Sequence, residues 1–198
     1  AGLMLWILGY PDRSLNTLSE ALNHARELAF THSLAMLLTN LSIVYILRRE
    51  PEHVQEFAEM AVQLCAEQDL PHWQALALIS LGWAMTLQGD HTQGLEAINQ
   101  GLASFESLGT SVVAYTHTLL ADIHLNAGNI AEGLQAVDQA IRAAEDTRVE
   151  TVLSMSLRIK SDLLRHAKAP SSETEALYQE AIAFARAHHA KSFELQAT

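Results

Sequence analysis

Apolar residues recur at helical spacing along most of the chain. In one clear case Ile130, Leu134, Val137 and Ile141 fall on a single face of a helix. No stretch of useful length alternates apolar and polar residues, which would be the pattern of a half-buried strand. The pattern therefore predicts an all-α protein. We expect helices at residues 1–8, 12–30, 33–48, 51–69, 71–88, 90–108, 111–127, 129–146, 149–166 and 172–189.

These helices form a repeat of about 40 residues, which is clearest in the stretch Leu81–Leu102. Turns within successive helix pairs stand 40, 40 and 39 residues apart, at Gly9, Arg49, Gly89 and Gly128. A small residue precedes each turn by seven positions, and another follows it by twelve. The preceding residues are Gly2, Ser42, Gly82, Ala121 and, in a fifth pair with one extra loop residue, Ser161; the following ones are Ala21, Ala61, Gly101, Ala140 and Ala181. Small residues let two backbones approach closely, so both columns predict where paired helices cross.

Helix-capping signals support the same division. Polar residues followed three positions later by Glu predict helix starts at Asn129 with Glu132, Thr147 with Glu150, and Ser172 with Glu175. Pro71 suits the first turn of a helix, and Gly109 suits the position just after one.

Stacked helix pairs that bury their apolar faces only against neighbours form solenoids. We therefore expect residues 1–198 to form a single domain, a right-handed superhelical solenoid of about five antiparallel helix pairs. The first expected helix lacks a recognisable start, and Lys191–Thr198 is typical of the start of a sixth pair. Neither end has the polar face of a capping unit, so we expect the chain to be a fragment of a longer multidomain protein.

The small-residue columns resemble those of the tetratricopeptide repeat, with a period longer than its usual 34 residues. Four stretches also resemble a narrower group, and they are Leu81–Ala84 with Gly89–Asp90, Asn126–Leu134, Leu157–Leu164 and Glu175–Ala197. In order and spacing they are similar to the C-terminal repeat region of bacterial multidomain proteins that join a class III adenylate/guanylate cyclase to an ATPase module. Related arrays are attached to transcription regulators of the maltose-activator type.

This resemblance covers essentially the whole chain, and it implies a regulatory or scaffolding segment of a signalling protein whose enzymatic domains lie elsewhere. The chain departs from the family at Ser161, where Gly is usual, and at Phe193 and Gln196, where Trp and Arg are commoner. None of these departures removes a catalytic group, because the resemblance assigns none to this region.

Composition narrows the classes of function. The net charge of −11 argues against binding a nucleic-acid backbone. Cys65 is the single cysteine, so no disulfide framework is expected. The apolar start of the chain reaches a turn at Gly9 too soon to span a bilayer and lacks the basic residues of a signal peptide. We expect a cytoplasmic protein that binds neither membrane nor nucleic acid.

Catalytic and metal-binding motifs are not evident. The sequence contains no phosphate-binding loop and no dinucleotide-binding glycine motif, and no cofactor is expected. Among the ten histidines, His117 and His124 share a helical face with Asp122 between them, but no cysteine or third ligand is near enough to favour a metal. We expect Cys65 to be buried and inert. The sequence therefore contains no group of residues that we expect to form a catalytic site.

The surface expected to bind a partner is the concave side of the array, which the first helix of each pair would line. Its predicted residues are Trp6, Thr39, Ile43, Ile46, Ile79, Trp83, Thr86, Thr118, Asp122, Leu125, Arg158, Asp162 and Arg165. In one interpretation a peptide or helix docks on the apolar half and is oriented by the charged half. In the other, Trp83 and Ile43 only fill a tight superhelix or pack on further repeats.

The predicted function is a non-catalytic protein–protein interaction module that docks a peptide, a helix or the catalytic domains of its own protein. The alternative is a small-molecule-sensing domain of a signalling or transcription regulator. Groove positions that hold Lys and Asn in chaperone-binding tetratricopeptide domains are here Thr39, Ile43, Ile79 and Trp83. We therefore expect no binding of a chaperone C-terminal carboxylate by that clamp.

Overall fold

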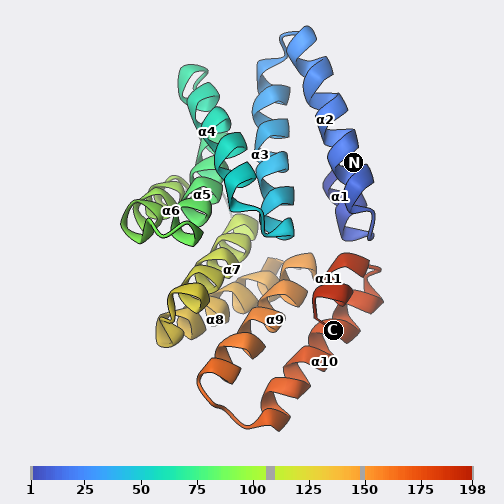
Figure 1. Ribbon diagram of the computed structural model, residues 1–198, viewed down its shortest axis with the longest axis vertical. Coiled ribbons are helices and arrows are strands. Elements are labelled where there is room, and N and C mark those ends of the chain that lie inside the picture. Colours follow the sequence, from blue (N-terminus) through green and yellow to red (C-terminus); the bar gives the residue numbers. More distant parts are fainter. Residues whose placement is uncertain (1, 106–109, 148–149, 198) are drawn as a thin grey trace. The chain divides into compact units, whose positions relative to one another are not determined.

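The structure, a computed structural model, describes residues 2–105, 110–147 and 150–197, with no side chains described at 110–112, 150 and 151. The described residues form helices and no strand, which confirms the all-α prediction (Figure 1). The helices are α1 (Gly2–Ile7), α2 (Pro11–Glu27), α3 (Thr31–Arg48), α4 (Pro51–Glu67), α5 (Pro71–Leu87), α6 (His91–Phe105), α7 (Thr110–Ala127), α8 (Ile130–Thr147), α9 (Glu150–His166), α10 (Ser171–Ala187) and α11 (Lys191–Gln196).

The turn column is confirmed by the backbone. Gly9, Gly89 and Gly128 have φ of 93°, 100° and 76°, and Arg49 takes the same left-handed region at 62°. In the fifth pair Lys168 stands in this column with φ 59°. A left-handed residue just after a helix lets the following amides close its last turn, and Arg49 N–H accordingly donates to the Ile46 carbonyl at 3.0 Å.

The predicted caps are only partly right. Helix α8 begins at Ile130, which puts Asn129 in the capping position as expected. Helix α10 instead begins at Ser171 with Pro170 before it, so the prediction for Ser172 is wrong. Thr147 does not open a new helix: it ends α8, where its hydroxyl donates to the Ala143 carbonyl at 2.6 Å. Gly109 lies outside the described residues.

The chain divides into two compact units, residues 1–6 with 10–108 and residues 7–9 with 109–198. In the first unit each of α2 to α5 packs against the next helix, and α3 also packs against α5 (Figure 1). The predicted crossings are confirmed in the α5–α6 pair. A Cβ on Gly82 would collide with the Gly94 carbonyl oxygen, and one on Gly101 would lie 2.7 Å from that of Ala75.

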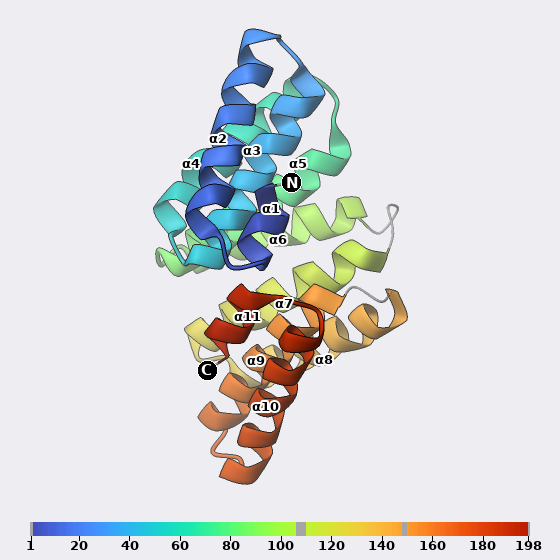
Figure 2. The ribbon, with the colours of Figure 1, turned by 90° about the vertical axis from the view of Figure 1, so that its right-hand side faces the viewer.

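In the second unit each of α7 to α10 likewise packs against the next, and α9 also contacts α7 (Figure 2). Here the α9–α10 crossings are bridged by hydroxyls. Ser161 Oγ donates to the Thr174 carbonyl at 2.7 Å, and Ser154 Oγ donates to the Ala181 carbonyl at 3.1 Å. This sequential packing is that of a helical repeat. Within the part of the chain that the structure describes, no helix is long and apolar enough to cross a bilayer.

Candidate functional site

Most of the residues predicted to line a partner-binding groove are buried. They are Trp6, Thr39, Ile46, Ile79, Trp83, Thr86, Thr118 and Asp122. The reason is that the first helix of a pair is covered by its own partner and by the first helix of the neighbouring pair, as α3 packs against both α4 and α5. Ile43, Leu125, Arg158 and Asp162 keep some exposed surface, and Arg165 is exposed.

Trp83 illustrates the consequence. Its side chain is 0% exposed, and the guanidinium carbon of Arg49 lies 5.8 Å from the centre of its ring. A side chain with no exposed surface does not contact a partner without rearrangement. The burial therefore favours the packing interpretation of Trp83, and its place in a docking surface stays a prediction.

The buried threonines of this set each donate a hydrogen bond to a carbonyl of their own helix. Thr39 donates to the Ala35 carbonyl at 2.8 Å, and Thr86 donates to that of Gly82 at 2.7 Å. Thr118 bonds its own helix in the same way and lies 2.7 Å from the Ser156 hydroxyl, which joins α7 to α9. A hydroxyl satisfied by the carbonyl four residues earlier can be buried without leaving a polar group unpaired.

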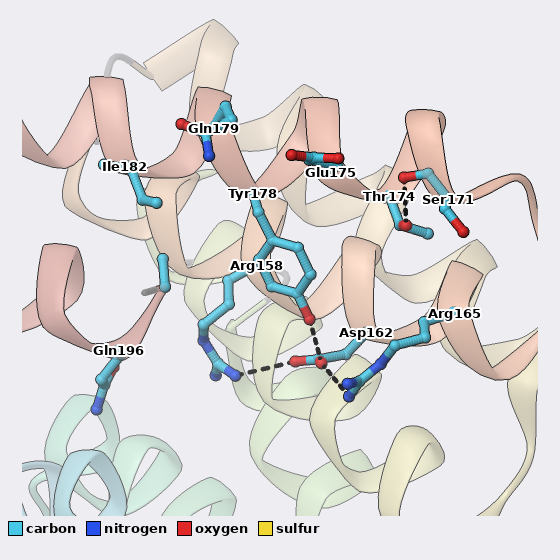
Figure 3. A pocket seen from close by; sticks show the side chains of 11 residues that line it. Arg158, Asp162, Arg165, Ser171, Thr174, Glu175, Tyr178, Gln179, Ile182 and Gln196 are labelled. Carbon is cyan, nitrogen blue, oxygen red and sulfur yellow. Dashed lines mark hydrogen bonds and ion pairs between the residues drawn. The ribbon is translucent and has the colours of Figure 1, made fainter.

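Three predicted residues do come together at a cavity, and they are Arg158, Asp162 and Arg165. Their spacing of four and three residues puts them on one face of α9. They line a pocket of about 780 Å³ in the second unit, whose other walls come from α10 and the segment around α11 (Figure 3). The remaining lining residues are Ser171, Thr174, Glu175, Tyr178, Gln179, Ile182, Gln196 and Ala197.

Asp162 is the centre of a polar cluster in this pocket. Its Oδ1 accepts hydrogen bonds from the Tyr178 hydroxyl at 2.6 Å and from Arg165 Nη2 at 2.9 Å, and its Oδ2 accepts one from Arg158 Nη1 at 3.1 Å (Figure 3). Burial raises the pKa of Tyr178, and the hydrogen bond to Asp162 raises it further, so the phenol remains a donor at neutral pH. The carboxylate is thus held by three donors from two helices.

The two arginines of the cluster differ in exposure. The Arg165 side chain is 64% exposed, whereas that of Arg158 is 20% exposed. The Nε atom of Arg158 is buried and has no hydrogen-bond partner. Ile182 and Ala197, which also line the pocket, belong to the same buried apolar cluster as Leu157. The pocket therefore combines a charged wall with an apolar floor.

The sequence prediction missed the contribution of α10, because it considered only the first helix of each pair. A signal was nevertheless present at Tyr178. The same column of the repeat holds Leu18, Ala58, Ile98 and Val137. A tyrosine in an otherwise apolar column marks the one pair in which this position faces a polar cluster.

Titratable groups outside this pocket include two that the sequence had singled out, Cys65 and His117. Among the described residues no three His, Cys, Asp or Glu side chains are grouped so as to hold a metal ion. Burial raises the pKa of the Cys65 thiol to about 11, so the reactive thiolate is scarce at neutral pH. His117 Nδ1 lies 2.9 Å from the Val113 carbonyl of its own helix. These side chains contribute to packing.

The first unit has a smaller groove, lined by residues other than those predicted. It has a volume of about 260 Å³ and lies among α2, α3 and α4, where Leu34, Leu38, Met60 and Leu64 give it an apolar lining. Met60 is 38% exposed. The accessible apolar surface here is thus separate from Trp83.

Comparisons with known proteins assign no family to this chain. Its sequence matches no model of a known protein family, and it matches no curated protein. The resemblance to the repeat region of cyclase–ATPase proteins therefore stays a prediction.

Proposed function

We propose that the chain is a non-catalytic interaction module whose docking site is the pocket formed by α9, α10 and α11. The observation that carries this proposal is the convergence of Arg158, Asp162 and Arg165 with Tyr178 around a cavity of about 780 Å³. Helical repeats use concave surfaces of this kind to bind extended or helical segments. The bound segment is a peptide or helix, supplied by another protein or by another part of the same protein.

The chemistry of the pocket favours binding over catalysis. A general base needs a carboxylate or imidazole with an acceptor site left for the substrate's proton. Asp162 is occupied by three donors, and the tyrosine that contacts it has a raised pKa. A group held in this way orients the side chains that surround it.

We also propose the wider architecture to which the pocket belongs. The repeat period and the buried small-residue columns support a right-handed solenoid of the tetratricopeptide type, working as a regulatory or scaffolding segment. In that arrangement Arg158, Asp162 and Arg165 occupy the concave face, while Thr39, Ile79 and Trp83 fill its interior.

A selection from a library of helical peptides tests the docking site. We expect binders that lose affinity when charge is reversed in the pocket by Arg165→Glu. They should also lose affinity when a negative charge is added to the neighbouring wall by Gln179→Glu, because both side chains line the cavity. Arg142→Glu is the matched control, since Arg142 is exposed on α8 outside the pocket. Binders that respond equally to Arg142→Glu and Arg165→Glu would contradict the assignment.

A second candidate function, sensing of a small molecule, is favoured by the size of the pocket. Its volume lies within the roughly 300–1,000 Å³ typical of small-ligand sites. A metabolite that raises the melting temperature of the protein, and no longer does so in the Arg165→Glu variant, would favour this alternative. A screen in which only peptides show pocket-dependent binding would favour docking.

A further inference from the structure

The arginines of the pocket cluster have unused hydrogen-bond donors, whereas most acceptor sites of its central carboxylate are occupied. A guanidinium carries five N–H donors, whereas a carboxylate has about four acceptor sites. Asp162 takes one bond from Tyr178, one from Arg165 and one from Arg158. Most donors of the two arginines are therefore left for something else, and the Nε of Arg158 is buried without a partner.

We infer that this pocket binds the carboxylate of an acidic side chain on the docking peptide, through Arg158 and Arg165. The inference deepens the proposed function and rests on it. A carboxylate is the acceptor that matches a guanidinium best, because it can take two parallel N–H bonds. A cationic side chain would instead meet two arginines and a carboxylate whose acceptor sites are mostly occupied.

The charges around the cluster support an anionic ligand. Two guanidinium groups face one carboxylate, which leaves a local excess of positive charge. Glu175, on α10, also lines the pocket, and Figure 3 shows it away from the Asp162 cluster. The chain as a whole is acidic, but eight of its 12 Lys and Arg residues lie between residues 109 and 198. The cationic spot is thus a local feature within an acidic protein.

The apolar floor favours a peptide over a free acid. Ile182 and Ala197 line the pocket and belong to the buried cluster beneath it. Aliphatic groups beside the bound carboxylate can pack there, and water leaving this surface strengthens the charged hydrogen bonds. The preferred sequence is therefore an acidic residue with aliphatic neighbours.

The test uses the arginine Nε–H signals of the full chain in a nitrogen-15 correlation spectrum. The probes are the capped peptide acetyl-LEL-amide, its uncharged counterpart acetyl-LQL-amide, glutarate and inorganic phosphate. We expect the acidic peptide to shift the signals of Arg158 and Arg165, to leave that of Arg142 unchanged, and to bind more tightly than glutarate. Equal binding of both peptides, or no shift of either pocket arginine, would overturn the inference.

Substitutions in the pocket should raise or lower the affinity for the acidic peptide in directions that the inference predicts. Arg165→Gln should weaken the acidic peptide about tenfold, the effect of losing one hydrogen bond to a charged group. Asp162→Asn and Glu175→Gln should both strengthen it, because each removes a competing negative charge. Weaker binding after both acidic substitutions, with the helical circular dichroism unchanged, would contradict the inference.

Failure of the acidic specificity and failure of the peptide docking give different experimental results. If library peptides bind in a pocket-dependent way but acetyl-LEL-amide does not shift the arginines, docking stands and its acidic specificity is refuted. If glutarate or phosphate binds as tightly as the acidic peptide, the pocket recognises a free anion, and the peptide source is refuted.

Discussion

The α5–α6 and α9–α10 pairs cross at the same repeat positions but use different side chains to do so. In α5–α6 the crossing is closed by glycine. Gly82 faces Gly94, and a Cβ on either would meet a backbone oxygen of the other, while Gly101 approaches the carbonyl of Ala75. The absence of side chains allows the two backbones to touch.

In α9–α10 the equivalent positions are bridged. Ser161 stands in the column of Gly82 and donates to Thr174, which stands in the column of Gly94. Ser154 stands in the column of Ala75 and donates to Ala181, in the column of Gly101. Both carbonyls belong to the opposite helix, so each serine is a direct link between helices.

This difference shows what the repeat specifies. The columns require a small volume, and either no side chain or a hydroxyl aimed at the opposite carbonyl satisfies them. Ser161, which departs from the glycine expected by resemblance, therefore has a structural reason. It also lies next to Asp162, so the bridge helps to fix the helix face that carries the pocket.

The largest effect on stability is expected from placing a serine at the glycine crossing of the α5–α6 pair. Gly82→Ser would place a Cβ against the Gly94 carbonyl oxygen and 2.6 Å from Ile98 Cγ1, and neither the backbone nor the buried Ile98 can yield easily. Overpacking of this kind costs about 2–3 kcal/mol of unfolding free energy, measurable by urea denaturation. Ala103→Ser, on the exposed face of α6, should change the stability by less than about 0.5 kcal/mol. A stable Gly82→Ser protein would show that the two crossings are interchangeable.

The reverse change should cost less. Ser161→Ala removes the hydrogen bond to the buried Thr174 carbonyl, at a cost of about 1 kcal/mol. Ser161→Gly loses the same bond and adds helix flexibility, for about 2 kcal/mol in total. Ser172→Ala, at an exposed position of α10, is the control in the same denaturation experiment. If Ser161→Gly were as stable as the parent, the bridge would contribute nothing beyond its small size.

A smaller effect is expected in the intervening α7–α8 pair. Gly133 stands in the column of Gly94, but a Cβ there would meet mainly the flexible end of Leu163 at 2.5 Å. Leu163 can shift, and alanine favours the helix over glycine by about 1 kcal/mol, so Gly133→Ala should change the stability by less than about 1 kcal/mol. Gly94→Ala is the comparison and should be clearly more harmful, because its neighbours include the backbone of Gly82 and Thr86. Equal losses of stability after Gly133→Ala and Gly94→Ala would mean that the repeat position itself, and not the neighbouring atoms, decides whether a Cβ is tolerated.

The features that the sequence predicted well are those set by local chemistry. Helix bounds follow from apolar spacing and, at α5, from Pro71 in the first turn, and turns follow from the glycine column. Crossing points follow from side-chain volume. Each depends on residues near in sequence and recurs in every pair, so the repeat reinforces the signal.

The features that it predicted poorly depend on which other helix covers a residue. Trp83 is of a residue type that often contacts partners, but it is buried because other helices cover it. Tyr178 was overlooked because its role depends on Asp162, 16 residues away on another helix. Ser172 has the spacing of a cap, yet the capping position is taken two residues earlier by Pro170, and the helix begins at Ser171.

The smallest effect concerns a column in which the α7–α8 pair differs from both pairs compared above. His124 stands there, where α5 has Met85 and α9 has Leu164. Burial lowers the pKa of His124, with Glu132 acting in the opposite direction, and its Nδ1 is buried without a hydrogen-bond partner. The folded state therefore binds this proton less readily than the unfolded chain. Stability should be complete above the ordinary histidine pKa of about 6.5 and should fall as the pH drops below it.

Urea denaturation at about pH 7.5 and about pH 5 measures this dependence, because the two values lie on either side of the ordinary histidine pKa. We expect His124→Leu, which copies the residue of the α9 column, to lose less stability on acidification than the parent protein. His166→Leu, at an exposed position of α9, controls for the loss of an imidazole that is not buried. If His124→Leu kept the full acid sensitivity of the parent, the pH response would arise elsewhere, and the apolar columns of α5 and α9 would give those pairs no advantage over α7–α8 in acid.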